Sequence, residues 1–309
     1  MKASPVFKSR SLPWLLLVPT LAILLVFLYF PVIQSFVLSL YRSNLFLGTQ
    51  RYIGVENFRN IFSGTLAPGF RQVLLQTLLF SGVVVASGLA GSLALALLAN
   101  QPVRGARVYR LLLIWPFALS PAVAGTIFLF MFNPEVGLVN QLLNALLGIK
   151  PRWLDTPALA FSIVCMAAVW KNLGYNIVFY LAALQNVPAE LGEAAQIDGA
   201  TGAQRFLAVT FPLLSPMTFF LFFTNLAYAF FDTFGLIDIV TAGGPVGAPP
   251  FDHAGVTSTL IYKIYQDGFG GAANLGFAAA ESVVLLALVA GVTALQFRFG
   301  GRRVYYGGA

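Results

Sequence analysis

Charge is scarce in this sequence. Only 9% of its 309 residues are Asp, Glu, Lys or Arg, whereas 58% are hydrophobic, and the mean hydropathy is +0.82. A soluble domain carries about 25% charged residues, so water cannot be the solvent for most of this surface. The composition therefore excludes an ordinary soluble globular protein and indicates a chain embedded in a lipid bilayer.

Cysteine and histidine are almost absent. The one cysteine, Cys165, cannot form an internal disulfide, and the one histidine, His253, has only Asp252 beside it. A zinc site needs three or four such ligands, so no metal site is expected. The sequence also lacks the GxxxxGK[ST], GxGxxG and HExxH motifs. We therefore expect no enzyme and no cofactor bound by this chain, and energy from ATP would have to come from another chain.

The sequence contains several long uncharged, apolar runs. About 20 apolar residues cross a hydrocarbon core, where only helices or closed barrels satisfy their backbone groups. The runs are too long for barrel strands. The predicted fold class is therefore all-α: one polytopic transmembrane domain, residues 1–309. Its six predicted transmembrane helices cover residues 12–40, 72–100, 111–133, 158–184, 207–231 and 275–297.

Basic residues near the helix ends predict the orientation. They gather in the N-terminal tail, the second loop and the C-terminal tail: Lys2, Lys8, Arg10, Arg104, Arg107, Arg110, Arg298, Arg302 and Arg303. Because short cytoplasmic loops are rich in Lys and Arg, both termini are predicted to be cytoplasmic. The first outer loop also carries arginines, which its length makes acceptable. The net charge of +7 has a topological cause, so no nucleic-acid partner is expected.

The loop over residues 188–212 is more than a turn. Pro188 suits a first helical position, and Gly199 suits the left-handed residue just past a helix end. Thr201 and Gln204 have capping-box spacing. We expect a helix, a turn and a second helix on the cytoplasmic side. Small residues and two acids in this loop predict a docking surface for another chain, and the alternative is an alanine-rich connecting loop.

A polar face lies deep in the fourth predicted helix. If the helix begins near Ala158, a rise of about 1.5 Å per residue puts Lys171 about 20 Å into a core of about 30 Å. Asn172, Tyr175 and Asn176 share its face. An ionisable group at this depth indicates a functional site. The alternatives are an internal ion pair, a carboxylate of a partner chain, or a stabilised kink.

Three groups of motifs resemble one family. The strings EAA at 193–195 and DGA at 198–200, followed by Phe206 and Pro212, resemble the EAA loop of ABC importer permeases. The strings GVENF at 54–58, NP at 133–134 with Gly137 and Asn140, and GGP at 243–245 resemble the carbohydrate-uptake branch. WKNLGYN at 170–176, YAFFDTF at 228–234 and LIYKIY at 260–265 resemble the A-type permease of sn-glycerol-3-phosphate importers. Residues 247–255 depart from this pattern and are interpreted as an insertion.

The resemblance implies a type I ABC importer permease fold in a prokaryotic inner membrane. The implied partners are a second permease in a heterodimer, two ATPase copies that hold ATP-Mg, and an extracytoplasmic binding protein. The residues implied to couple to the ATPase are Glu193, Ala194, Ala195, Asp198, Gly199 and Ala200. The implied substrates are sn-glycerol 3-phosphate and glycerophosphodiesters. The alternative is a neutral sugar or oligosaccharide, for which Lys171 would be structural.

We expect the substrate to pass a set of polar side chains: Lys171, Asn172, Tyr175, Asn176, Tyr228 and Asp232. Lys171 would attract a phosphate. Glu281, near the outer end of the last helix, is expected to contact water or the binding protein, as is Asp232. An ion-coupled secondary transporter would need a carboxylate near the midplane, where neither acid is predicted. Pro116 and Pro121 break the hydrogen-bond ladder of the third helix. Such breaks often border a binding site, but prolines are ordinary in membrane helices, and this structural explanation is the favoured one.

Overall fold

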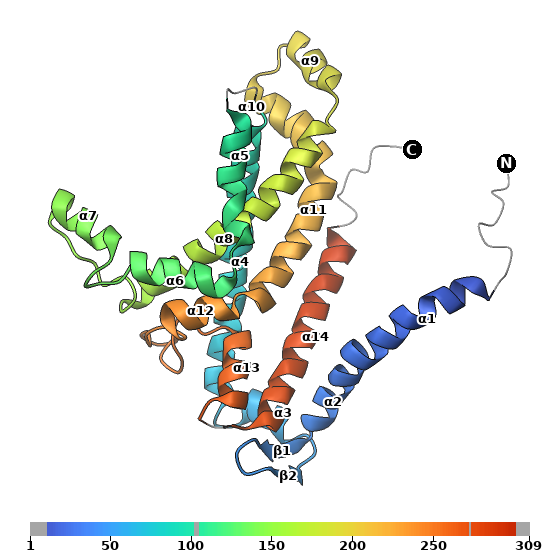
Figure 1. Ribbon diagram of the computed structural model, residues 1–309, viewed down its shortest axis with the longest axis vertical. Helices are drawn as coiled ribbons and strands as arrows, with labels where there is room; N and C mark the ends of the chain where they lie inside the picture. The colour runs from blue at the N-terminus through green and yellow to red at the C-terminus, as the bar shows by residue number, and fades with distance from the viewer. Residues whose placement is uncertain (1–10, 102–104, 272, 301–309) are drawn as a thin grey trace. The chain divides into compact units, whose positions relative to one another are not determined.

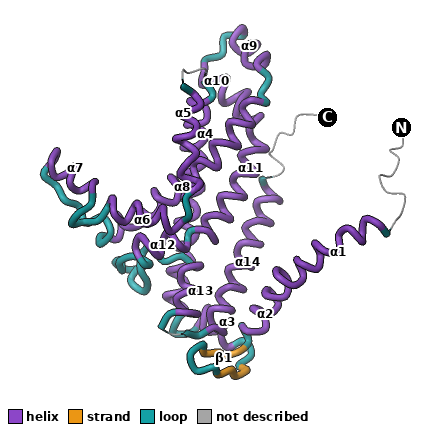
Figure 2. The backbone as a smooth tube through the Cα atoms, in the orientation of Figure 1, coloured by secondary structure: helices purple, strands orange, loops and turns teal. Residues whose placement is uncertain are grey.

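The computed structural model describes residues 11–101, 105–271 and 273–300, which are mostly helical (Figures 1 and 2). The strands described there are β1 (Tyr41–Asn44) and β2 (Thr49–Tyr52), which pair antiparallel. The described residues divide into two compact units: unit 1 comprises 11–64 and 264–284, and unit 2 comprises 65–263 and 285–300.

Unit 1 begins with a long apolar helix. Besides the two strands, its elements are α1 (Leu12–Leu24), η1 (Leu25–Tyr29), α2 (Phe30–Leu38), α3 (Glu56–Ser63) and the adjoining parts of α13 (Leu260–Phe269) and α14 (Leu275–Phe299). The first three run on as one helix, Trp14–Leu38, whose most apolar stretch has no buried residue among those described. Such a surface is stable only against lipid or another chain.

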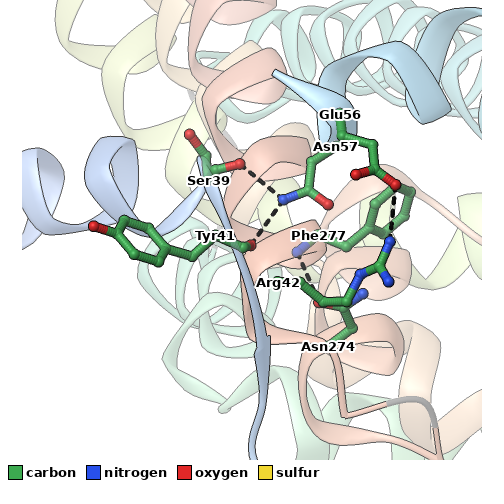
Figure 3. Close-up of polar contacts among 7 residues, drawn as sticks. All are labelled: Ser39, Tyr41, Arg42, Glu56, Asn57, Asn274 and Phe277. Atoms are coloured by element: carbon green, nitrogen blue, oxygen red, sulfur yellow. Dashed lines mark hydrogen bonds and ion pairs between the residues drawn. The ribbon is translucent and has the colours of Figure 1, made fainter. Parts of the chain in front are cut away.

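Polar side chains fix the turn from the first helix into β1 (Figure 3). The Asn57 side-chain amide donates to the carbonyls of Ser39 at 2.8 Å and Tyr41 at 3.0 Å. Arg42 forms an ion pair with Glu56, with Nη2 and Oε1 2.8 Å apart. The motif at 54–58 therefore has a structural role, because two of its side chains hold the chain where it leaves the helix.

The start of α14 corrects one expectation. Asn274 accepts a hydrogen bond from the Phe277 amide at 3.2 Å, which satisfies a donor of the first helical turn (Figure 3). A side chain at Gly276 would strike the main chain of Tyr41, so the glycine permits close packing there. Glu281, predicted to contact water, is fully buried instead. The small residues before it allow this close packing, which removes water from the carboxylate.

The secondary-structure elements described in unit 2 are all helices, joined by loops. Its elements are α4 (Ala67–Ala99), α5 (Ala106–Ile114), η2 (Trp115–Ala118), α6 (Pro121–Met131), α7 (Leu138–Leu147), α8 (Pro157–Gln185), α9 (Ala189–Ile197), α10 (Gly202–Arg205), η3 (Phe206–Thr210), α11 (Phe211–Ala227), η4 (Tyr228–Asp232), α12 (Phe234–Thr241), the first turn of α13 and the end of α14. The helices α4, α8 and α11 pack together around the buried side chain of Tyr180.

Glycine allows two helices to approach α8 closely. A side chain at Gly174 of α8 would lie 2.6 Å from the Ile114 carbonyl at the end of α5. Gly88 and Gly91 of α4 face side chains of α8. All three positions fit the rule that small residues let membrane helices pack tightly. Gly82, farther toward the N-terminal end of α4, has open space around it among the described residues.

The third predicted span is broken. Five helices among the described residues are long and apolar enough to cross a membrane. A sixth crossing requires the pair Val108–Ala118 and Pro121–Met131, which is bent by 103°. Pro116 and Pro121 lack amide hydrogens and interrupt the helical hydrogen bonds here, as predicted. In Figure 1, α6 accordingly turns away from the direction of α5.

Few of the basic residues that predicted the orientation can be placed. Arg110 donates to the Ala99 carbonyl at 3.0 Å, where a cation stabilises the C-terminal end of α4. Arg298 lies in the last turn of α14. The side chain of Arg107 lies outside the described residues. So do the six remaining basic residues: Lys2, Lys8, Arg10, Arg104, Arg302 and Arg303.

Candidate functional site

A cavity of about 420 Å³ in unit 2 collects most of the predicted pathway residues. Its walls come from α8, from α11 with η4, and from the break in the third span. The lining residues are Phe117, Lys171, Asn172, Tyr175, Phe223, Thr224, Ala227, Tyr228, Phe231 and Asp232. All the predicted pathway residues except Asn176 therefore face one cavity, although they come from two separate helices.

Lys171 is held between aromatic rings. Its Nζ lies 5.6 Å from the ring centroid of Phe117 and 5.6 Å from that of Tyr228, within the range of cation–π attraction. Only 7% of Lys171 is exposed. Tyr228 is itself fixed, because its hydroxyl donates to the Ala168 carbonyl at 3.2 Å. The ammonium group is thus positioned by side chains and lies on a cavity wall.

The proline break supplies one of these rings. Phe117 lies in η2, the short helix between α5 and α6. It also contacts Tyr175, with ring centroids 5.3 Å apart. An unbroken helix would not bend the chain at this point. The break that the sequence predicted therefore borders the cavity, and it does so through a residue that sequence reasoning missed.

Three asparagines join α8 to α11 beside the cavity. Asn225 Oδ1 accepts from the Nδ2 atoms of Asn172 at 2.8 Å and Asn176 at 2.9 Å. Asn225 Nδ2 donates to Asn176 Oδ1 at 2.6 Å and to the Leu221 carbonyl at 2.7 Å. All three asparagines are buried. Asn176, expected on the pathway, does not line the cavity because this network turns its amide toward α11.

Sequence reasoning missed Asn225, although a signal existed. It precedes Tyr228 and Asp232 by three and seven residues, so all three share one face of an otherwise apolar helix. A lone amide on that face indicates a buried hydrogen-bond partner, because an unpaired one is costly in an apolar interior. Thr224, which also lines the cavity, gave no comparable signal.

The cavity has the chemistry of a binding site. It offers one cation, the amide of Asn172 and the phenol of Tyr175, and the exposed carboxylate of Asp232 lines the same cavity. The cation suits a small anion and the amide and phenol suit hydroxyls, whereas Asp232 offsets part of the positive charge of Lys171. Among the described residues, no three His, Cys, Asp or Glu side chains gather to hold a metal ion.

The predicted coupling loop has the predicted local structure. Gly199 has φ +82° and follows α9, as its sequence position indicated. The Gly199 amide donates to the Gln196 carbonyl at 3.1 Å, and the Ala200 amide donates to the Ala195 carbonyl at 2.9 Å. This pair of bonds is a Schellman motif. Pro188 is one residue off, because it precedes the first helical residue.

A capping box starts the next helix. Thr201 Oγ1 accepts from the Gln204 amide at 3.4 Å, and the Thr201 amide donates to the Gln204 side chain at 2.8 Å. Arg205 donates to the Gln196 side chain at 3.1 Å, which braces α9 against the helix that follows. The turn between the helices is therefore held from both sides.

The surface of α9 is open. Glu193, Ala194, Asp198 and Gly199 are exposed, and Ala195 and Ala200 are partly exposed. Ile197 was not predicted as a contact, yet 86% of it is exposed. An apolar side chain at that exposure on a braced helix is suited to insertion into a groove of another protein.

The segment interpreted as an insertion is anchored to α4. The Gln72 side chain accepts from the amides of His253 at 2.7 Å and Ala254 at 3.1 Å, and it donates to the Ala254 carbonyl at 2.8 Å. Farther along α4, Thr77 Oγ1 accepts from the Leu260 amide at 2.8 Å. This loop is therefore held in a defined position rather than hanging free.

The sequence resembles known proteins along almost its whole length. The family described as "Binding-protein-dependent transport system inner membrane component" matches residues 86–304. A protein of Pectobacterium atrosepticum named "sn-glycerol-3-phosphate transport system permease protein UgpA" is 43% identical over 98% of each chain. Proteins of the same name from Rhizobium meliloti and Agrobacterium fabrum are 43% and 42% identical, over 98% of this chain and 99% of each relative.

Solved structures show the same fold. One is described as a bacterial alginate ABC transporter in complex with an alginate pentasaccharide-bound periplasmic protein. It matches with a TM-score of 0.80 at 23% identity, over 97% of both chains. Another, described as a bacterial ABC transporter involved in the import of the acidic polysaccharide alginate, matches with a TM-score of 0.75 at 24% identity, over 94% of this chain and 96% of that one.

Proposed function

Because the chain belongs to the family of binding-protein-dependent transport system inner membrane components, we propose that it carries sn-glycerol 3-phosphate into the cytoplasm. A member of this family is the multi-pass permease subunit of an ABC importer in the inner membrane, and it is not an enzyme. The substrate is the proposed part. Relatives named for sn-glycerol 3-phosphate match this chain from end to end, which supports it.

The observation that carries the substrate proposal is the position of Lys171. Its ammonium group lies on the wall of a cavity inside the apolar part of unit 2. A phosphate passing this point would meet a charge-assisted hydrogen bond from Lys171. Asn172 and Tyr175 would bind hydroxyl groups or the remaining phosphate oxygens. A neutral sugar would use the amide and the phenol but would have no need of the cation.

The proposed mechanism is alternating access. The loaded binding protein docks on the outer loops, and closure of two ATPase subunits, which hold ATP-Mg, moves α9. The coupling residues are Glu193, Ala194, Ala195, Asp198, Gly199 and Ala200, with Ile197 added from its exposure. A second permease completes a heterodimer. Transport then requires only that the cavity bind substrate with different affinities in the two states.

We propose six membrane crossings, with the bent pair counted as one and both termini in the cytoplasm. The position of the coupling loop supports this orientation, since it has to meet a cytoplasmic ATPase. A tag fused to the C-terminus is expected to be cut by protease in inside-out vesicles and to be protected in right-side-out vesicles. The reverse pattern would contradict the proposed orientation.

Uptake distinguishes the candidate substrates. Right-side-out vesicles that contain the chain with its co-purifying partners are loaded with ATP and given external radiolabelled sn-glycerol 3-phosphate, with unlabelled maltose or glycerophosphocholine as competitors. We expect ATP-dependent uptake that glycerophosphocholine reduces and maltose does not. Absence of uptake, or inhibition by maltose, would reassign the substrate to sugars and leave the permease function unchanged.

Replacement of Lys171 tests the anion site itself. A hydrogen bond to a charged group contributes about 1.5–3 kcal/mol, so Lys171→Met is expected to raise the concentration for half-maximal uptake by about 10- to 100-fold. Lys150→Met removes an exposed lysine from a loop and is the matched control. Uptake at unchanged affinity in Lys171→Met would refute the phosphate role.

A further inference from the structure

The segment between α6 and α8 is held rigidly by a buried asparagine. Asn140 donates to the carbonyls of Pro134 at 2.9 Å and Pro151 at 3.0 Å, and it accepts from the indole nitrogen of Trp153 at 2.7 Å. Asn140 is itself part of α7. One side chain therefore fastens the helix to the chain on both sides of it.

The entry to α7 is equally constrained. Asn133 Oδ1 accepts from the amides of Glu135 at 2.9 Å and Val136 at 3.1 Å. A side chain at Gly137 would lie 2.6 Å from the Met131 carbonyl, so a glycine is needed there. The helix thus leaves α6 in one direction, and the orientation of its faces is set by the structure.

The residues of α7 divide into three sectors at about 100° per residue. The inward sector contains Asn140 and its neighbours. One exposed sector is apolar, with Leu138 56%, Leu142 54% and Leu146 78% exposed. Another contains the exposed amides Gln141 and Asn144. Leu147, in the last position of the helix and next to Asn140 around the helix axis, is also 65% exposed. Within unit 2, α7 lies beyond α6 and away from α4 and α8 (Figure 1).

The place of α7 in the chain suggests what covers the leucines. It comes directly before α8, a membrane-spanning helix of 29 residues and about 43 Å, whose far end leads to the coupling loop. It also follows α6, on which Phe130 is largely exposed. The apolar sector therefore continues a lipid-facing surface at the membrane end opposite the coupling loop.

We infer that α7 is an interfacial helix that rests in the lipid bilayer surface. Its 10 residues extend about 15 Å, too short to cross a core of about 30 Å. The leucine sector enters the acyl region and the amide sector faces the headgroups, the arrangement typical of interfacial helices.

Spin labels on single cysteines test this inference in the reconstituted importer. Labels at L142C and L146C sample the leucine sector, and labels at Q141C and N144C on the same helix are matched controls, with Cys165 replaced by alanine. Collisions with lipid-soluble oxygen are expected to dominate at the leucine positions. Collisions with a water-soluble nickel chelate are expected to dominate at the amide positions.

Two outcomes would overturn the inference. Equal access of the nickel chelate to all four labels would place α7 in water. Protection of the leucine positions from both reagents would mean that a protein partner covers the face. Leu142→Trp provides a second readout without a label. The fluorescence that it adds to that of the four native tryptophans is expected to be quenched by brominated lipid and not by aqueous iodide.

Discussion

Asn225 concentrates much of the polar bonding between α8 and α11 in one side chain. Its amide serves two asparagines of α8 and one carbonyl of its own helix. A buried donor or acceptor that loses its partner costs about 1–3 kcal/mol. The network therefore specifies one packing of the two helices beside the cavity, because any shift would leave several amides unpaired.

Replacement of this residue should destabilise the permease. Asn225→Leu keeps the volume but removes the partners of Asn172 and Asn176, so we expect a loss of about 2–4 kcal/mol and a clear fall in the melting temperature of the purified protein. Asn186→Leu changes an exposed asparagine that bonds only to the preceding helical turn, and it is the control. Equal melting temperatures of the two variants would contradict a structural role for the network.

The residue scale also shows what helical periodicity can predict. Spacing placed Lys171, Asn172, Tyr175 and Asn176 on one face. The first three line the cavity, whereas Asn176 bonds to Asn225 of α11. Periodicity cannot tell which part of a polar face meets a cavity and which part meets another helix. Asn176 meets Asn225 of another helix. Because Asn225 is distant in the sequence, only the fold could reveal this contact.

At the scale of elements, local signals were reliable. The capping box at Thr201 and the left-handed glycine at Gly199 depend only on neighbouring residues, so the sequence could predict them. The break in the third span was predictable for the same reason. Its angle of 103° was not, because the packing of α6 against α12 decides it.

Two glycines of the coupling loop are expected to respond differently to alanine. Gly199 has a positive φ, which costs a residue with a side chain about 1–2 kcal/mol, so Gly199→Ala should disturb the Schellman motif. Gly192 lies within α9 with open space around it, so Gly192→Ala should be tolerated.

Transport per ATP hydrolysed measures this difference. We expect Gly199→Ala to lower it, a combined replacement of Glu193 and Gly199 to uncouple transport, and Gly192→Ala to leave it unchanged. Full coupled transport in the combined variant would contradict the coupling role of this loop.

The loop of residues 247–255, which Gln72 anchors to α4, gives a second prediction. Gln72→Leu removes the acceptor of the His253 and Ala254 amides, so those amides should exchange hydrogen with water faster. Gln141→Leu, at an exposed position in α7, is the control and should leave their exchange unchanged. Unaltered exchange in Gln72→Leu would show that other contacts hold the loop.

For the whole molecule, composition alone indicated that the chain is embedded in a lipid bilayer. Scarce charge and long apolar runs predicted a helical membrane protein, and the family confirms it. Composition could not predict the two units, since these depend on which helices meet after folding. It also could not reveal that Glu281 is buried, because the sequence placed that residue by its distance from a helix end.

Cysteine labelling tests the orientation of the whole chain. N144C lies before α8 and N186C just after it, so they should be on opposite sides of the membrane. In right-side-out vesicles, a membrane-impermeant maleimide is expected to label N144C alone. Native Cys165 is buried and should contribute little background. Labelling of both cysteines before permeabilisation would contradict the proposed orientation.

The exposed first helix has a consequence for biogenesis. Because Trp14–Leu38 buries none of its most apolar stretch against the described residues, it can enter the bilayer as soon as the ribosome releases it, without waiting for later segments. Among the described residues, the apolar stretch of this helix therefore has to preserve its hydrophobicity but no packed partner, while the later helices must also preserve one another's shape.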